Sequence, residues 1–174
     1  LVADSDVVGL WFDSILGHWG NQGVHYYILA QLGWNPRADG AAILEDYYRR
    51  AYGPAAATLR AYWELCEQAT LAMTLEGRPE EEVWDAAFHA KANQLLDQAT
   101  EELADAPPKY AQRVTFARAG LEYLRLLQEN RALVQRWNDS RKQDSVARDA
   151  AVANGSRVEA LMKEHPFLLN SYYI

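Results

Sequence analysis

Cysteine, long apolar runs and positive charge are all scarce in this sequence of 174 residues. Its single cysteine, Cys66, excludes an internal disulfide framework and a zinc site built from several cysteines. No uncharged apolar run approaches the roughly 18 residues that a membrane-spanning helix needs, so we expect no membrane partner. The 17 Lys and Arg residues are outnumbered by 24 Asp and Glu residues, and the net charge of −7 argues against nucleic-acid binding.

Several chemical motifs are missing as well. There is no Gly-x-Ser-x-Gly elbow, no phosphate loop, no dinucleotide fingerprint and no helical His-x-x-x-His pair, so we expect no cofactor. Asp13, His18 and His25 lie in one stretch, but their spacing matches no standard ligand pattern, so we expect no metal. Residues 1–6 lack a basic region followed by an apolar one, so the N-terminus is expected to be a cut end without a signal peptide.

A short apolar run near the N-terminus differs from the rest of the chain. Val7–Phe12 is continuously apolar between Asp6 and Asp13, which is typical of a strand covered on both faces. No second convincing strand follows, so we expect its neighbours to come from chain upstream of Leu1. Residues 13–23 hold three glycines among polar and aromatic groups and predict a loop.

Helical spacing of apolar residues dominates from Val24 to Glu164. We expect a mainly α fold, an irregular bundle or array of five to six helices preceded by the one strand. Breaks are predicted near residues 35–39, 53, 77–79, 106–108 and 139–143, where proline, glycine and capping residues gather. The fourth helix is predicted to begin at Glu80 and continue to about Leu103, and Asn154-Gly155 is expected to interrupt the last helix.

Two segments resemble a known family. Gly17–Pro36 (GHWGNQGVHYYILAQLGWNP) and Leu44–Ala56 (LEDYYRRAYGPAA) resemble a bacterial family of uncharacterised glycoside-hydrolase-like proteins, similar in layout to the α-glucuronidases. The resemblance implies a (β/α)₈ barrel followed by a helical domain. On that basis residues 1–23 are the last barrel strand with its active-site loop, and residues 24–174 are the C-terminal helical domain.

The residues offer no pair of catalytic carboxylates. Glycoside hydrolysis needs two carboxyl groups roughly 5–9.5 Å apart. Asp13 is the only acid at the loop end of the strand, and Asp6 at the other end is about 23 Å away in an extended chain. We therefore predict that the isolated chain is inactive and that any catalytic residues lie upstream. Asp13 is either a sugar-binding residue or an acid that caps backbone amides of the loop.

The expected loop carries the candidate substrate-binding residues, which are Asp13, His18, Trp19, Asn21 and Gln22. An indole face can stack on a sugar ring, while imidazole and amide groups can hydrogen-bond its hydroxyls. Alternatively, Trp19 plugs the junction between barrel and helical domain, and His18 satisfies a backbone carbonyl. The resemblance favours the substrate-binding interpretation of His18 and Gln22.

Other polar and aromatic residues have structural interpretations. The pairs Tyr26-Tyr27 and Tyr47-Tyr48 are expected mainly in the core, with one member of each pair facing an interface. Cys66 is expected to be an inert core thiol, and His89 and His165 to be surface or helix-end residues.

Two functions are expected as alternatives. Either the chain is the C-terminal portion of a glycoside-hydrolase-like protein, with a carbohydrate and an upstream catalytic barrel as partners, or it is a non-catalytic helical structural or interaction module.

Overall fold

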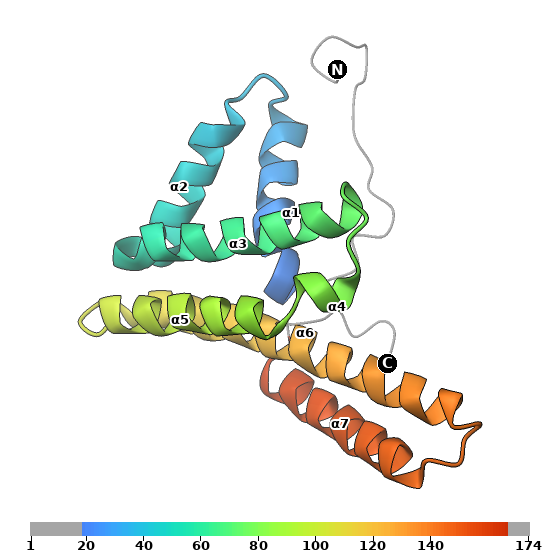
Figure 1. Cartoon of the computed structure of the whole chain (residues 1–174). Helices are drawn as coiled ribbons and strands as arrows, with labels where there is room; N and C mark the ends of the chain where they lie inside the picture. The colour runs from blue at the N-terminus through green and yellow to red at the C-terminus, as the bar shows by residue number, and fades with distance from the viewer. Residues whose placement is uncertain (1–18, 167–174) are drawn as a thin grey trace.

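The structure, a computed structural model, describes residues 19–166, and within that range all regular secondary structure is helical (Figure 1). From the N-terminal end the elements are α1 (Trp19–Trp34), α2 (Gly40–Tyr52), the 3₁₀ turn η2 (Gly53–Ala55), α3 (Ala56–Thr74), the short α4 (Glu80–Val83), α5 (Ala86–Glu102), α6 (Pro108–Asp139) and α7 (Ser145–Glu164). The prediction of a mainly α fold is confirmed for these residues, which hold six long helices and the four-residue α4 where five to six helices were expected. The predicted strand Val7–Phe12 lies outside the described residues.

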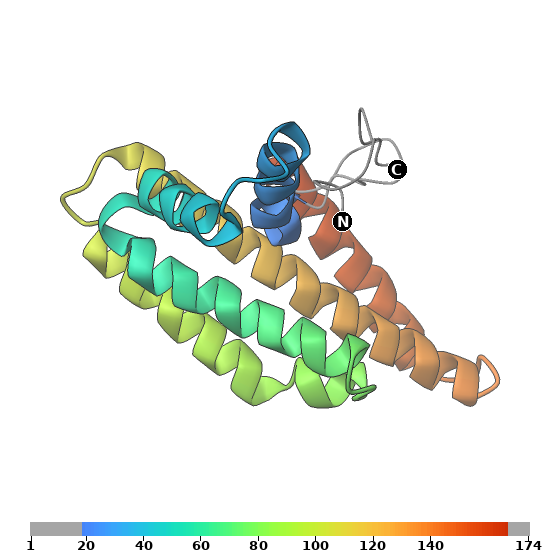
Figure 2. The same cartoon turned by 90° about the horizontal axis from the view of Figure 1, so that it is seen from above.

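The helices form two regions that share α6. In Figure 1 and in the turned view of Figure 2, α1 and α2 form a hairpin, α2 packs against α3, and α3 lies beside α5. The first part of α6 packs against α1, α2 and α5, and these helices together are called the bundle. Because α6 has 32 residues, it is about 48 Å long and extends beyond the bundle. Its part from Glu122 onward and α7 pack along each other, and this pair is called the arm.

Most predicted breaks are confirmed, and their local chemistry is visible. Asp39 precedes α2 and accepts hydrogen bonds from the backbone amides of Ala41 and Ala42, as an N-cap does. Gly53 follows α2 with a φ of 54°, a conformation that favours glycine. The arm turns at residues 140–144, where Asp144 caps α7 through the amide of Ala147.

The N-terminal boundary of the first helix was predicted wrongly. The helix α1 begins at Trp19, so residues 19–23 are helical where a loop was expected. Gly20 is buried and Val24 exposes only 6 % of its surface, which shows that the first turn packs against the bundle. This tertiary packing outweighs the loop-forming tendency of Gly20 and Gly23.

Two further helix predictions need correction. The expected fourth helix is divided between α4 and α5, because Asp85 adopts an extended conformation and its carboxylate accepts a hydrogen bond from the amide of Phe88. Asn154-Gly155 does not interrupt α7, which is continuous. Asn154 is buried, and its amide group donates to the carbonyl oxygen of Leu126 at 2.7 Å, so a partner on α6 stabilises the helical position.

The hydrophobic core lies in the bundle. Leu59 of α3 and Leu96 of α5 are fully buried at its centre. Aromatic side chains surround them on the side of α1 and α2, namely Tyr48, Tyr52, Tyr62 and Trp63. The buried members of this cluster end at Leu121 on α6, and within the arm Leu124 still packs against it.

Candidate functional site

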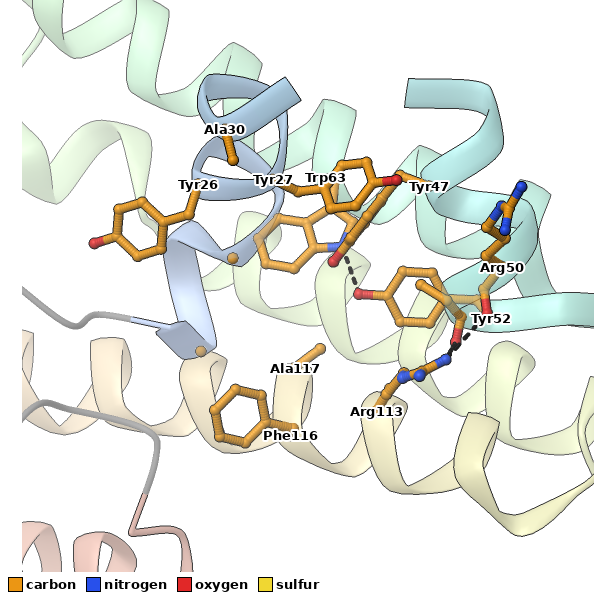
Figure 3. Close-up of a pocket in the computed structure, with 13 residues that line it drawn as sticks. Tyr26, Tyr27, Ala30, Tyr47, Arg50, Tyr52, Trp63, Arg113, Phe116 and Ala117 are labelled. Carbon is orange, nitrogen blue, oxygen red and sulfur yellow. Dashed lines mark hydrogen bonds between the residues drawn. The ribbon is translucent and has the colours of Figure 1, made fainter. Parts of the chain in front are cut away.

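Two cavities flank α1 within the bundle, one on each side of the helix. The first has a volume of about 570 Å³, and Figure 3 shows the side chains around it. The second has a volume of about 430 Å³ and lies against the other side of α1. The indole of Trp63 lines both. Volumes in this range are typical of small-molecule sites, so each cavity is a candidate site.

Aromatic rings form the wall of the first cavity. The rings of Tyr27 and Tyr47 lie 5.0 Å apart between centroids, and Tyr47 meets Tyr52 edge to face at 6.0 Å. The Nε1 atom of Trp63 donates a hydrogen bond to the hydroxyl of Tyr52 at 3.2 Å (Figure 3). These contacts fix the rings in position, so they present flat apolar faces and hydroxyl groups to one space.

The small residues of α1 keep this cavity open. Gly20, Gly23 and Ala30 line it from the helix that carries Tyr27. A Cβ atom built on Gly23 would meet nothing within 4 Å, so close packing does not require a glycine here. The backbone of α1 is therefore accessible to a ring-shaped molecule in the cavity.

Two arginines give the first cavity a cationic end. The Nη1 atom of Arg113 donates hydrogen bonds to the carbonyl oxygens of Arg50 and Ala51, at 3.0 and 2.8 Å, where α2 ends. Arg50 pairs through Nε with the Oδ2 atom of Asp46 at 2.6 Å. No Asp or Glu among residues 19–166 lines this cavity. The arrangement can bind a polar ring but holds no carboxyl pair for acid–base chemistry.

The buried phenols of the first cavity stay neutral near pH 7. Burial raises the pKa of Tyr47 above its ordinary value of 10.0, and it raises the pKa of Tyr52 further. A neutral hydroxyl both donates and accepts hydrogen bonds. The cavity therefore offers two-way hydrogen-bonding partners next to aromatic faces.

The second cavity has more aliphatic side chains in its wall than the first. Its wall consists mainly of aliphatic and aromatic side chains, among them Val24, Ile28, Leu44, Leu121, Leu124 and Trp84. Cys66 also lines it, and burial raises the pKa of that thiol to about 12. The thiol is therefore protonated near neutral pH and unreactive, as the sequence predicted.

The structure describes only part of the predicted site. Asp13 and His18 lie outside the described residues. Trp19, Asn21 and Gln22 belong to the first turns of α1 rather than to a loop, and their side chains also lie outside the described part. The structure shows that their neighbours in this segment, Gly20 and Gly23, line the first cavity. The predicted segment thus adjoins the cavity, while the roles of the five predicted residues stay predictions.

Sequence reasoning missed the residues that line the cavities. The expectation that Tyr47 and Tyr48 pack in the core is confirmed, but it did not foresee that Tyr47 also lines the first cavity and Tyr48 the second. Adjacent aromatic positions on a helix point to different sides, and this is the signal that could have separated them. Arg113 gave no local signal, because its partners lie 62 and 63 residues away in the chain.

One histidine was also misplaced. His89, expected at the surface, is half-buried, and its Nε2 atom lies 2.9 Å from the Oε1 atom of Gln128. Its Nδ1 atom is buried without a hydrogen-bond partner in the described part of the chain. His165 does cap the end of α7, as predicted. Residues 19–166 contain no group of three His, Cys, Asp or Glu side chains that could hold a metal ion.

No helix among the described residues has the length and apolar character needed to cross a membrane.

Comparisons with known proteins give one family match. Searches of curated proteins and of solved structures found no significant match to the chain. Residues 1–64 match the family described as a domain of unknown function, DUF4838, and this match includes α1, α2 and the first half of α3.

Proposed function

We propose that the chain is the C-terminal portion of a glycoside-hydrolase-like, carbohydrate-active protein, and that it contributes one wall of the sugar-binding cleft and a helical support domain. The observation that carries this proposal is the first cavity, in which Tyr27, Tyr47, Tyr52 and Trp63 surround a space of about 570 Å³. Sugar rings have apolar C–H faces that pack on aromatic rings and hydroxyl groups that need hydrogen-bonding partners. The cavity supplies both.

The predicted sugar-binding segment is next to this cavity. Gly20 and Gly23 belong to the segment that resembles the glycoside-hydrolase-like family, and both line the space. In the proposal, Asp13, His18, Trp19, Asn21 and Gln22 form the mouth of the cleft. The match of residues 1–64 to one family supports treating the segment, α1 and α2 as a unit.

Catalysis in this proposal belongs to a barrel upstream of Leu1. The first cavity has no carboxylate among its described lining residues, and hydrolysis of a glycosidic bond needs two. Residues 7–12 would be the last barrel strand, and residues 13–18 would connect it to α1. The described helices would then bind and position the sugar, and the barrel would supply the acid and the base or nucleophile.

A second candidate is a non-catalytic helical interaction module. The specific observation in its favour is the arm, which extends away from the bundle (Figure 1). Val134, Val146 and Val152 are exposed on it. An exposed helix pair with apolar side chains can dock on a partner protein.

Sugar titration of a protein that includes the upstream chain distinguishes the two functions. We expect glucuronic acid or a neutral monosaccharide to change tryptophan fluorescence in a saturable way. Gly23→Leu fills the first cavity with a good helix-forming residue, so it should abolish the response and leave the helical circular dichroism unchanged. Gly155→Leu is the matched control on α7, where a Cβ atom also meets nothing within 4 Å.

The outcomes are distinct. A saturable response that Gly23→Leu removes and Gly155→Leu retains supports the sugar cleft. A response to sugar that survives Gly23→Leu places the sugar elsewhere and contradicts the assignment of the first cavity. No response to any sugar in the longer protein favours the interaction module.

A further inference from the structure

Two helices that line the first cavity contribute no acidic residue to it, although the chain has a net charge of −7. The helix α1 contains no Asp or Glu, and α6 contains none before Glu122. The first part of α6 instead carries Arg113 and Arg118, and the last turn of α2 carries Arg49 and Arg50. The first cavity therefore lies on a cationic part of an acidic chain.

At the end of α2, one carboxylate serves two guanidinium groups. Asp46 pairs with both Arg50 and Arg49, and the hydrogen bonds from these two arginines lower the pKa of Asp46. The carboxylate is therefore ionised near pH 7, and the three side chains together retain one positive charge. Because Arg50 lines the first cavity, this charge lies at its edge.

Arg113 adds a second positive charge that no acidic side chain balances. Its Nη1 atom donates to the carbonyl oxygens of Arg50 and Ala51, and these contacts hold the guanidinium where α2 ends, beside the ring of Tyr52 (Figure 3). Carbonyl oxygens carry only partial charges, so they orient the side chain without cancelling its charge. Among residues 19–166, Arg113 forms no other hydrogen bond and no ion pair. A guanidinium held in this way, with N–H groups to spare, fits the oxygen atoms of an anion.

We propose that the sugar bound in the first cavity is acidic, carrying a carboxylate or sulfate group, and that Arg113 pairs with this group. The inference rests on the proposed function, because it names the class of sugar for the same cleft. The rings of Tyr27 and Tyr47 would contact the sugar ring, and the acidic group would lie at the cationic end, where α2 meets α6. A neutral sugar would leave the guanidinium without an anionic partner and should bind more weakly.

The test is calorimetric titration of the protein that includes the upstream chain, with six matched sugars at one low ionic strength. The probes are glucose and galactose, their C6 acids glucuronate and galacturonate, and their 6-sulfates. We expect an acidic form to bind about five- to tenfold more tightly than its neutral counterpart. This ratio should fall in about 0.5 M NaCl, because salt screens an exposed charge pair. The carboxylate and sulfate series show which acidic group is preferred.

The outcomes separate this inference from the proposed function. Neutral sugars that bind as tightly as their acidic forms overturn the assignment of an acidic sugar and leave the sugar cleft supported. No binding of any of the six sugars contradicts the sugar cleft, and this inference with it.

Substitutions then test the role of Arg113. Arg113→Gln removes the charge and should bring the ratio of acidic to neutral affinity close to one, whereas Arg113→Lys keeps the charge without the planar group and should keep part of the preference. The matched control is Arg118→Gln on the same helix, because Arg118 pairs with Asp97 at 2.8 Å and does not line the cavity. This control should leave the ratio unchanged. An equal fall in Arg113→Gln and Arg118→Gln would reflect net charge alone and contradict the pairing with Arg113.

Discussion

In the bundle, most residues buried between α3 and α5 are apolar, and Leu59 and Leu96 are both fully buried, while the buried hydroxyl of Thr58 donates to the Glu102 carboxylate at 2.8 Å. In the arm, Leu126 of α6 and Ala147 of α7 are also fully buried, and the buried amide of Asn154 on α7 donates a hydrogen bond to the carbonyl oxygen of Leu126. Charged side chains continue this contact, since Arg157 reaches Glu122 at 3.4 Å and Glu129 at 3.5 Å. The comparison shows that both regions bury apolar side chains, but that the bundle buries many more of them, whereas in the arm directional polar contacts have a larger part in setting how α7 aligns on α6.

The largest expected effect is the loss of the bundle at alkaline pH. Burial raises the pKa of Cys66 from 9.0 to about 12, and it also raises the pKa values of the buried tyrosines, among them Tyr48, Tyr52 and Tyr62, above 10.0. In the unfolded chain these groups lose their protons at lower pH than in the folded one. Their contribution to stability is therefore complete below about pH 9 and is lost as the pH rises towards 12.

The arm should respond at the opposite end of the pH scale. The hydrogen bonds from Arg125 lower the pKa of Glu122, and the backbone amide of Ala147 lowers that of Asp144. These contributions are present above about pH 4.5 and are lost as the pH falls through the folded-state pKa values. Circular dichroism and tryptophan fluorescence against pH would check both limits. A bundle that unfolds in acid before it does in alkali would contradict the comparison.

The next effect is that of a cavity in the centre of the bundle. Leu59→Ala removes a fully buried side chain and should lower the free energy of unfolding by about 2–5 kcal/mol. Urea unfolding followed by circular dichroism measures it. The matched control is Leu75→Ala, because Leu75 exposes 78 % of its surface and its truncation should cost little. Equal losses in the two variants would show that Leu59 is not part of a packed core.

A backbone effect comes next, at the corner between α2 and α3. Gly53 has a φ of 54°, and an added Cβ would lie 2.8 Å from the ring of Tyr110. We expect Gly53→Ala to lower the free energy of unfolding by about 1–3 kcal/mol. Gly40→Ala serves as the control in urea unfolding, since its Cβ would meet nothing within 4 Å. A neutral Gly53→Ala would mean that the corner relaxes without strain.

The arm is tested by its buried amide. Asn154→Ala removes the hydrogen bond to Leu126 and should destabilise the packing of α7 by about 1–2 kcal/mol. In limited proteolysis of this variant we expect faster cleavage within residues 140–164, while the rate of cleavage within the bundle stays the same. Asn93→Ala is the control, because the exposed Asn93 amide donates to the carbonyl oxygen of His89 within its own helix and not to another helix. Cleavage that starts in the bundle instead would show that the two regions do not open separately.

The smallest effect is a gain in stability at the tip of the arm. Arg141 follows α6 with a φ of 55°, in the left-handed conformation that ends many helices, and its amide donates to the carbonyl oxygen of Asn138. Arg141→Gly removes the steric cost of that conformation and should raise the free energy of unfolding of the arm by about 1 kcal/mol. Thermal unfolding measures it. A destabilised variant would show that the arginine side chain, and not its backbone, is what matters at this position.

Much of the fold followed from local signals. Two helices begin at the N-caps Asp39 and Asp144, and α2 ends at Gly53. The groups that these residues contact lie within a few positions along the chain, so the sequence was sufficient to place them. Asn154 is different, because its partner Leu126 is 28 residues away. Local rules treat Asn-Gly as a helix breaker, and only a tertiary contact reverses that.

The candidate site was less predictable than the fold. The aromatic residues were correctly placed on helices, but an apolar stripe has the same pattern whether it packs tightly or borders a cavity. The position of Trp63 between two cavities depends on how the hairpin of α1 and α2 sits on α3 and α6, which is a property of the assembled helices. The predicted residues of the first segment, including Trp19, were chosen for their chemistry, and that choice stays a prediction.

The long helix α6 has a consequence for how the protein is made. It packs against α1, α2, α5 and α7, so the bundle and the arm both need it. Ribosomes add about 5–20 residues per second, so the 32 residues of α6 take about 2–6 s to synthesise. During that time the aromatic side of α1 and α2 has no α6 to cover it. The nascent chain therefore passes through a stage in which a chaperone that recognises exposed apolar surface has its best opportunity to bind.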